Sequence, residues 1–138
     1  MSTLSRIPIL ITEDDEDNRV FLEFILTEAG YQVTASSEPE DALSAARATH
    51  FDLYLLDNWL PGGSGIELCR ALREFDVLTP ILFVSGAAYE TDRQNALHAG
   101  AQGYMVKPVD AVSLIAEISR LIADAKSNVL TASADAPA

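Results

Sequence analysis

Residues 51–65 read FDLYLLDNWLPGGSG, and this stretch decides the fold. The run Phe51–Leu56 is almost wholly apolar, as expected of a strand buried on both faces of a parallel sheet. It ends at Asp57, and the Pro-Gly-Gly that follows has the composition of a turn. The stretch therefore predicts a central strand that delivers a carboxylate to one edge of a sheet.

Similar runs recur on both sides of this strand. Ile7–Thr12 and Pro80–Val84 are equally apolar, and weaker strand candidates follow at Tyr31–Ala35 and Gly103–Val106. Between them lie stretches with helical periodicity, which are residues 16–29, 39–48, 64–74, 90–99 and a last one that follows Asp110. Five strands alternating with five helices predict an α/β domain, a parallel sheet covered by helices on both faces.

The sequence also predicts one face of the first helix and the capping residues of two helices. In the first, Val20, Phe21 and Phe24 share one face with Glu28. Asp15 is suited to cap the start of that helix, and Asp110 the start of the last.

The composition narrows the function further. The chain has 138 residues, and 9 Lys and Arg against 21 Asp and Glu give a net charge of −12. Such an acidic domain has no electrostatic footprint for nucleic acid or an anionic membrane. A single cysteine, Cys69, excludes an internal disulfide and a cysteine-based zinc site. With no apolar stretch of about 20 residues and no signal peptide, we expect a cytoplasmic protein.

The end of the chain differs in composition. From about residue 127 the sequence reads SNVLTASADAPA, which can bury little. We therefore expect one globular domain over residues 1–126 and a disordered tail over residues 127–138.

Polar side chains follow four of the predicted strands, and in such a sheet ligands bind beyond the carboxyl ends of the strands. The residues concerned are Glu13, Asp14, Asp57, Ser85 and Lys107. Clustered carboxylates favour a divalent cation among them, and ligands that are all oxygen suit Mg²⁺ or Mn²⁺ better than zinc. A lysine beside them could supply a positive charge and a hydroxyl a hydrogen bond to a phosphoryl group, which leaves one carboxylate as the nucleophile.

At these residues the sequence resembles the receiver domain of bacterial two-component response regulators, from about Ile7 to Ala125. The resemblance is carried by Glu-Asp after ILIT, by LLDNWLPGGSG around Asp57, by VSG at Ser85 and by ALHAGAQGYMVKP up to Pro108. It implies a doubly wound, flavodoxin-like fold with strand order 2-1-3-4-5.

The resemblance also implies a role for each matching residue. Asp57 corresponds to the phosphoacceptor, and Lys107 and Ser85 to the groups that contact the phosphoryl oxygens. The metal would be held by Asp14 and Asp57 directly, by Glu13 through water and by the backbone carbonyl of Trp59. Tyr104, together with Ser85, corresponds to the conformational switch, and the peptide bond between Lys107 and Pro108 is expected to be cis.

The function implied is that of a phosphorylation-controlled switch. A histidine kinase or a histidine phosphotransfer protein would donate the phosphoryl group, and an unknown output protein would recognise the result, with the chain a monomer or a phosphorylation-dependent dimer. Both a stand-alone receiver and a receiver cut from a longer regulator fit the sequence.

Two other functions fit less well. A Mg²⁺-dependent aspartyl phosphohydrolase usually carries a second aspartate where this chain has Trp59. A flavin carrier needs a Ser/Thr/Gly-rich phosphate loop, which residues 8–15 lack. His50 and His98 are interpreted as surface residues and Cys69 as a packing residue.

Three residues depart from the commonest pattern of the family. Ser85 stands in place of the more frequent threonine, a change that keeps the hydroxyl. Trp59 is bulky where smaller or polar residues are common, and Ala87 has no polar group. We hypothesise that Trp59 shields an acyl phosphate from water and that Ala87 cannot orient a water molecule, so that dephosphorylation is slow.

Overall fold

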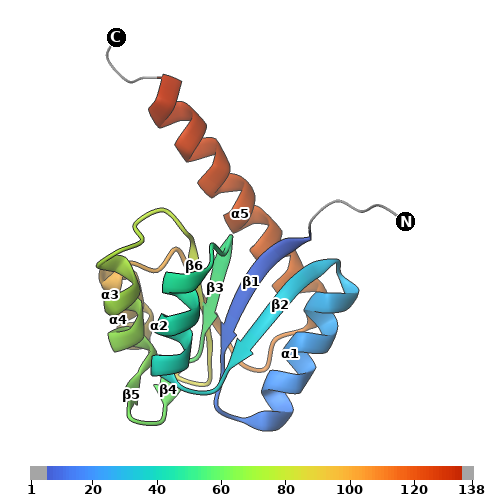
Figure 1. Cartoon of the computed structure of the whole chain (residues 1–138). Helices are drawn as coiled ribbons and strands as arrows, with labels where there is room; N and C mark the ends of the chain where they lie inside the picture. Colours follow the sequence, from blue (N-terminus) through green and yellow to red (C-terminus); the bar gives the residue numbers. More distant parts are fainter. Residues whose placement is uncertain (1–5, 135–138) are drawn as a thin grey trace.

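A five-stranded parallel sheet forms the centre of the computed structural model, which describes residues 6–134 (Figure 1). Its strands are β1 (Ile7–Thr12), β2 (Tyr31–Ser36), β3 (Leu53–Leu56), β6 (Ile81–Ser85) and β7 (Gly103–Val106). The spatial order is β2-β1-β3-β6-β7, and every neighbouring pair is parallel. Counted along the chain as the five long strands, this is the predicted order 2-1-3-4-5, so the fold prediction is confirmed.

The helices lie on both faces of the sheet, which makes the domain doubly wound. They are α1 (Glu16–Glu28), α2 (Pro39–Ala48), α3 (Gly65–Arg73), α4 (Glu90–Ala99) and α5 (Ala111–Ala134). One core cluster joins α2, α3 and α4 to the sheet, through residues such as Ala42, Leu72 and Ala96. The other joins α1 and α5 to the opposite face, through residues such as Leu26 and Ile118.

Capping residues define where the helices start and stop. The Asp15 side chain accepts a hydrogen bond from the Asn18 amide at the start of α1, at 2.9 Å. Asp110 does the same for the Ser113 amide before α5, at 2.7 Å. Both predicted caps are confirmed. Gly100 ends α4 with a φ of 117°, a left-handed conformation that glycine adopts without strain.

The apolar face of α1 differs from the prediction. Val20, Phe21 and Phe24 are 55%, 47% and 64% exposed, whereas Leu22 and Leu26 are the residues that face the core. Both sets have helical spacing, so periodicity alone did not decide which one the sheet covers. The structure thus leaves three large apolar side chains of α1 in contact with solvent.

A short hairpin interrupts the alternation of strands and helices. β4 (Trp59–Leu60) and β5 (Gly63–Ser64) pair antiparallel where the sequence predicts only a turn. The two residues between them are Pro61 and Gly62, and Gly62 has a φ of 74°, a left-handed conformation that glycine adopts without strain. The hairpin begins at Trp59, two residues after Asp57, so its first side chain lies close to the end of β3.

The C-terminal segment also differs from the prediction. α5 continues as a helix to Ala134, so residues 127–134 are helical where the sequence predicts a disordered tail. That stretch contains neither glycine nor proline, and most of its residues are compatible with a helix that has already formed. Residues 135–138 lie outside the described residues. In Figure 1 the last turns of α5 extend beyond the sheet, at the edge opposite the α1 N-terminus.

Within residues 6–134, no helix is both long and apolar enough to cross a membrane.

Candidate functional site

Four strand ends meet at one edge of the sheet and present the predicted polar residues. Glu13 follows β1, Asp57 follows β3, Ser85 is the last residue of β6 and Lys107 follows β7. Backbone hydrogen bonds fix these segments across the sheet edge, from the Asp57 amide to the Thr12 carbonyl at 3.1 Å and from the Lys107 amide to the Ser85 carbonyl at 2.9 Å. The side chains thus start from a rigid, pre-formed frame.

Three carboxylates lie together at this edge. Glu13, Asp14 and Asp57 each offer an oxygen atom, and these atoms lie within 4.8 Å of one another. Glu13 is 1% and Asp57 5% exposed, whereas Asp14 is exposed to solvent. The cluster is therefore open on the side of Asp14 and closed on the side of Glu13.

Lys107 is the cation that faces this cluster. Its Nζ donates to Glu13 Oε1 at 2.5 Å and to Asp57 Oδ2 at 3.0 Å. Burial opposes the charge of Lys107, but the hydrogen bonds to the two carboxylates outweigh burial and raise the pKa of the ammonium. Lys107 consequently stays charged across the physiological range and draws together the segments that follow β1, β3 and β7.

The charge balance of the cluster suits a divalent cation. Burial raises the pKa of the Glu13 carboxyl and the charge of Asp57 adds to this shift, although the hydrogen bond from Lys107 opposes it. Three carboxylates against one ammonium leave a negative excess in a partly buried site. A hard cation with oxygen ligands, such as Mg²⁺, fits this donor set.

Trp59 lies at the mouth of the site. Its backbone amide donates to Asp57 Oδ1 at 3.3 Å, and its side chain is 62% exposed. The ring lies against Gly86, since a Cβ built on this glycine would be 3.2 Å from Trp59 Cζ3. The indole thus reaches from the loop after β3 to the loop after β6.

Ser85 and Tyr104 are coupled through the loop after β6. Ser85 is fully buried, and its Oγ accepts from the Ala87 amide at 3.2 Å. The Tyr104 hydroxyl donates to the Ala87 carbonyl at 2.7 Å, and its ring stacks on Phe83 with 5.8 Å between centroids. One residue, Ala87, therefore bonds to both side chains.

The Lys107–Pro108 peptide bond is cis in the structure, as predicted.

One residue of the site escaped the sequence analysis. The Arg19 guanidinium, from the first turns of α1, donates to the carbonyls of Glu13 and Asp14. Bonds to main-chain carbonyls leave no signature in the sequence, so only the structure could reveal this contact.

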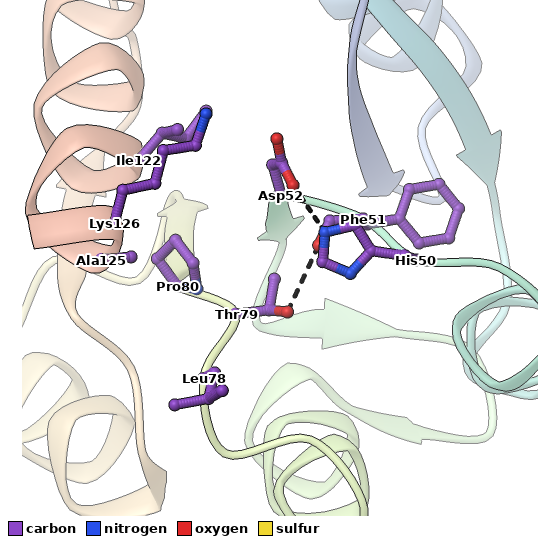
Figure 2. A pocket seen from close by; sticks show the side chains of 9 residues that line it. All are labelled: His50, Phe51, Asp52, Leu78, Thr79, Pro80, Ile122, Ala125 and Lys126. Carbon is purple, nitrogen blue, oxygen red and sulfur yellow. Dashed lines mark hydrogen bonds and ion pairs between the residues drawn. The ribbon is translucent and has the colours of Figure 1, made fainter. Parts of the chain in front are cut away.

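One pocket lies beside the acidic cluster, and a second pocket lies far from it. A groove of about 420 Å³ beside the cluster is lined by residues that include Phe21, Lys107 and Pro108. Figure 2 shows a different pocket of about 430 Å³ between α5 and the segments that enter β3 and β6, with the hydrogen bond between His50 and Asp52 at its wall. That pocket lies at the opposite ends of the strands and contains no member of the acidic cluster. His50 is exposed, as predicted.

A doubly wound parallel sheet with a lysine-bridged carboxylate cluster at the carboxyl ends of its strands defines a class of α/β domains that can hold a cation and a phosphoryl group at one edge. The sequence of residues 9–119 matches the response regulator receiver domain family. The chain belongs to this family, whose members are phosphorylation-dependent signalling switches of two-component systems.

Individual relatives agree with this assignment. The response regulator ArlR of Staphylococcus aureus is 36% identical over 114 residues, which cover 83% of this chain and 52% of ArlR. The chain thus spans about half the length of the curated relatives that it matches.

Solved structures are similar over most of this chain. A CheY-like receiver domain from Methanospirillum hungatei has a TM-score of 0.86 and 27% identity, and the match covers 90% of this chain and 99% of that one. The receiver domain of a sensor histidine kinase from Pseudomonas aeruginosa, solved with a magnesium ion coordinated in its active site cleft, has a TM-score of 0.81 and 30% identity over 86% of this chain and 99% of that one.

Proposed function

We propose that Asp57 accepts a phosphoryl group from a phosphohistidine of a histidine kinase or a histidine phosphotransfer protein. The observation that carries the proposal is the position of its carboxylate, which is almost buried, bonded to Lys107 at 3.0 Å and grouped with Glu13 and Asp14. Lys107 and the backbone amide of Trp59 each hold one oxygen of this carboxylate, which fixes its orientation.

The transfer needs positioning and charge neutralisation more than covalent chemistry. An Asp57 oxygen attacks phosphorus, a P–O bond forms, and the P–N bond to the donor imidazole breaks, so that its electron pair returns to the ring nitrogen. The Lys107 ammonium lies where it can neutralise charge on the transferred oxygens. The phosphoryl group of the resulting acyl phosphate carries about −1.5 to −2 charge at this edge.

The acidic cluster is the proposed magnesium site, and Mn²⁺ is a possible substitute. Asp14 and Asp57 would bind the ion directly, with Glu13 acting through water and the carbonyl of Trp59 completing the set. The fit rests on the oxygen-only donors within 4.8 Å and on the excess negative charge. When bound, the ion supplies charge neutralisation for the phosphoryl oxygens.

The switch would act through Ala87. If Ser85 turns its hydroxyl toward the phosphoryl group, the bond from the Ala87 amide to Ser85 Oγ is lost. The loop after β6 is then free to move, and Tyr104, which donates to the Ala87 carbonyl, moves with it. The surface formed by α4, β7 and α5 changes as a result, which alters affinity for an output partner.

The partner that donates the phosphoryl group is proposed to dock on α1. Val20, Phe21 and Phe24 form an exposed apolar patch, which we call the α1 patch. Phe21 also lines the groove that contains Lys107, so the patch is continuous with the proposed phosphorylation site. Exposed apolar patches beside a functional site mark protein interaction surfaces.

The test is incubation with acetyl phosphate and Mg²⁺, followed by intact mass measurement. The parent chain is expected to gain one phosphoryl group and Asp57→Asn none. Asp52→Asn is the matched control, because Asp52 lies at the opposite end of β3, where it pairs with His50. A parent that stays unmodified, or an Asp57→Asn variant that is modified as readily, would contradict the proposal.

A further inference from the structure

Arg19 makes two hydrogen bonds to the main chain that carries the acidic cluster. Its Nη1 donates to the Glu13 carbonyl at 3.0 Å and to the Asp14 carbonyl at 3.3 Å. Arg19 itself is on α1, four residues after the Asp15 cap, so a rigid helix anchors its side chain. One nitrogen atom thus ties α1 to two consecutive peptide units.

Two cationic side chains, Lys107 and Arg19, lie near the cluster and bond to different kinds of acceptor. Among the residues that the structure describes, the ion pairs of the cluster are made by Lys107, to Glu13 and Asp57. Arg19 bonds instead to carbonyl oxygens, which are weaker acceptors than carboxylates. Its contacts therefore do not occupy the carboxylate oxygens of Glu13 and Asp14.

The segment that Arg19 holds determines where two carboxylates point. On one side the Glu13 amide donates to the Ser36 carbonyl at 3.0 Å, which ties the segment to the sheet. On the other side the Asp15 amide donates to Glu13 Oε2 at 3.2 Å. Rotation of the peptide units between these points would swing the side chains of Glu13 and Asp14, and Arg19 opposes that rotation.

We propose that Arg19 is a positioning residue, which holds the main chain of Glu13 and Asp14 so that their carboxylates are pre-arranged for a divalent cation. The inference rests on the proposed function of the cluster as a magnesium site. Residues that orient metal ligands in this way typically contribute about tenfold or more to metal affinity.

The sign of the effect separates positioning from simple electrostatics. A positive charge close to a cation site repels the cation, so that removal of the charge alone should tighten Mg²⁺ binding. Loss of a positioning contact should weaken binding instead. Arg19→Met removes the charge and both hydrogen bonds while it keeps the length of the side chain, so the two explanations predict opposite results.

The experiment is a Mg²⁺ titration of the full chain followed by fluorescence of Trp59, the only tryptophan in the sequence. We expect Arg19→Met to raise the Kd for Mg²⁺ about tenfold and Arg19→Lys to recover part of the loss, because an ammonium can donate to the same carbonyls. Arg70→Met, which removes an equal charge from an exposed position on α3, should leave the Kd unchanged.

A second readout guards against a general structural effect. The rate of phosphorylation by acetyl phosphate should be lower for Arg19→Met at limiting Mg²⁺ and should approach the parent rate when Mg²⁺ is saturating. Unchanged or tighter Mg²⁺ binding in Arg19→Met, or a rate defect that saturating Mg²⁺ does not reduce, would overturn the inference. Should Arg19→Met fail to fold, the same criteria apply to Arg19→Gln.

The outcome also distinguishes this inference from the proposed function. A parent chain that binds no Mg²⁺ would contradict the magnesium site itself. A parent that binds Mg²⁺ beside an Arg19→Met variant that binds it equally well would contradict only the role of Arg19.

Discussion

Removal of Lys107 should destabilise the metal-free protein, and the size of the effect should depend on pH. Lys107→Met leaves the Glu13 carboxylate, which is 1% exposed, without its counter-ion. Deletion of one partner of a buried ion pair costs about 3–5 kcal/mol if the other charge remains. Glu13 can avoid part of this cost by binding a proton.

The free energy needed to protonate Glu13 is the upper limit of the destabilisation that its unpaired charge can cause. For a carboxyl with an ordinary pKa of 4.5 this limit is about 3.4 kcal/mol at pH 7 and about 0.7 kcal/mol at pH 5, because each pKa unit corresponds to about 1.36 kcal/mol. Lys107 is 23% exposed, so water can partly replace it. We therefore expect Lys107→Met to lose about 2–3 kcal/mol at pH 7 and less than about 1 kcal/mol at pH 5.

The sign follows from linkage. Burial raises the pKa of Glu13 above its value in the unfolded chain, and removal of Lys107 raises it further. The folded variant thus binds the proton more tightly than the unfolded chain does, so its stability is retained at low pH and lost as pH rises through the folded-state pKa.

Urea unfolding followed by circular dichroism, in EDTA at both pH values, gives the two free energies. Lys126→Met, at an exposed position on α5, is the matched control and should show little change at either pH. The double variant Lys107→Met/Glu13→Gln should regain most of the stability at pH 7. An equal loss at pH 5 and pH 7 would refute the reasoning, since it would indicate lost packing and not an unpaired buried charge.

Three further predictions concern other parts of the molecule. Asp76 accepts four hydrogen bonds, among them one from the Tyr54 hydroxyl at 2.7 Å, and these outweigh burial and lower the pKa of its carboxyl. Asp76→Asn should therefore lose about 2 kcal/mol in urea unfolding at pH 7 and progressively less as pH falls below 3.8, because a lowered pKa stabilises the fold only above that range. Trp59→Asn should lose a phosphoryl group about threefold faster or more, since the indole would no longer cover the gap toward Gly86, and an unchanged rate by mass spectrometry would contradict the shielding hypothesis. Phe24→Ser should slow phosphoryl transfer from a phosphohistidine protein about tenfold without an effect on acetyl phosphate, whereas Leu78→Ser, at the opposite edge, should affect neither.

Burial and chain order are the two features of this fold that the sequence reveals most directly. Strands of a parallel sheet are covered on both faces, so β1, β3 and β6 are continuous apolar runs that composition alone reveals. Since all strands of such a sheet point the same way, their last residues must meet at one edge. For this reason the amino-acid sequence alone is enough to group Glu13, Asp57 and Lys107.

Other features lay beyond a reading of the sequence. The exposed face of α1 and its buried face are both apolar, and only the placement of the helix on the sheet decides between Phe24 and Leu26. Arg19 and Arg73 act through carbonyl oxygens, and Arg73 donates to the carbonyls of Gly100 and Thr79 among others. Such contacts depend on three-dimensional proximity and leave no periodic pattern in the chain.

The length of α5 has a mechanical consequence. The helix begins at Ala111, four residues after Lys107, and its 24 residues span about 36 Å, so that its far end projects past the opposite edge of the sheet (Figure 1). A pivot of about 5° at its base would displace that end by about 3 Å. A small rotation of α5 close to Lys107 would in this way become a larger displacement at the far end of the helix, where a neighbouring molecule could bind.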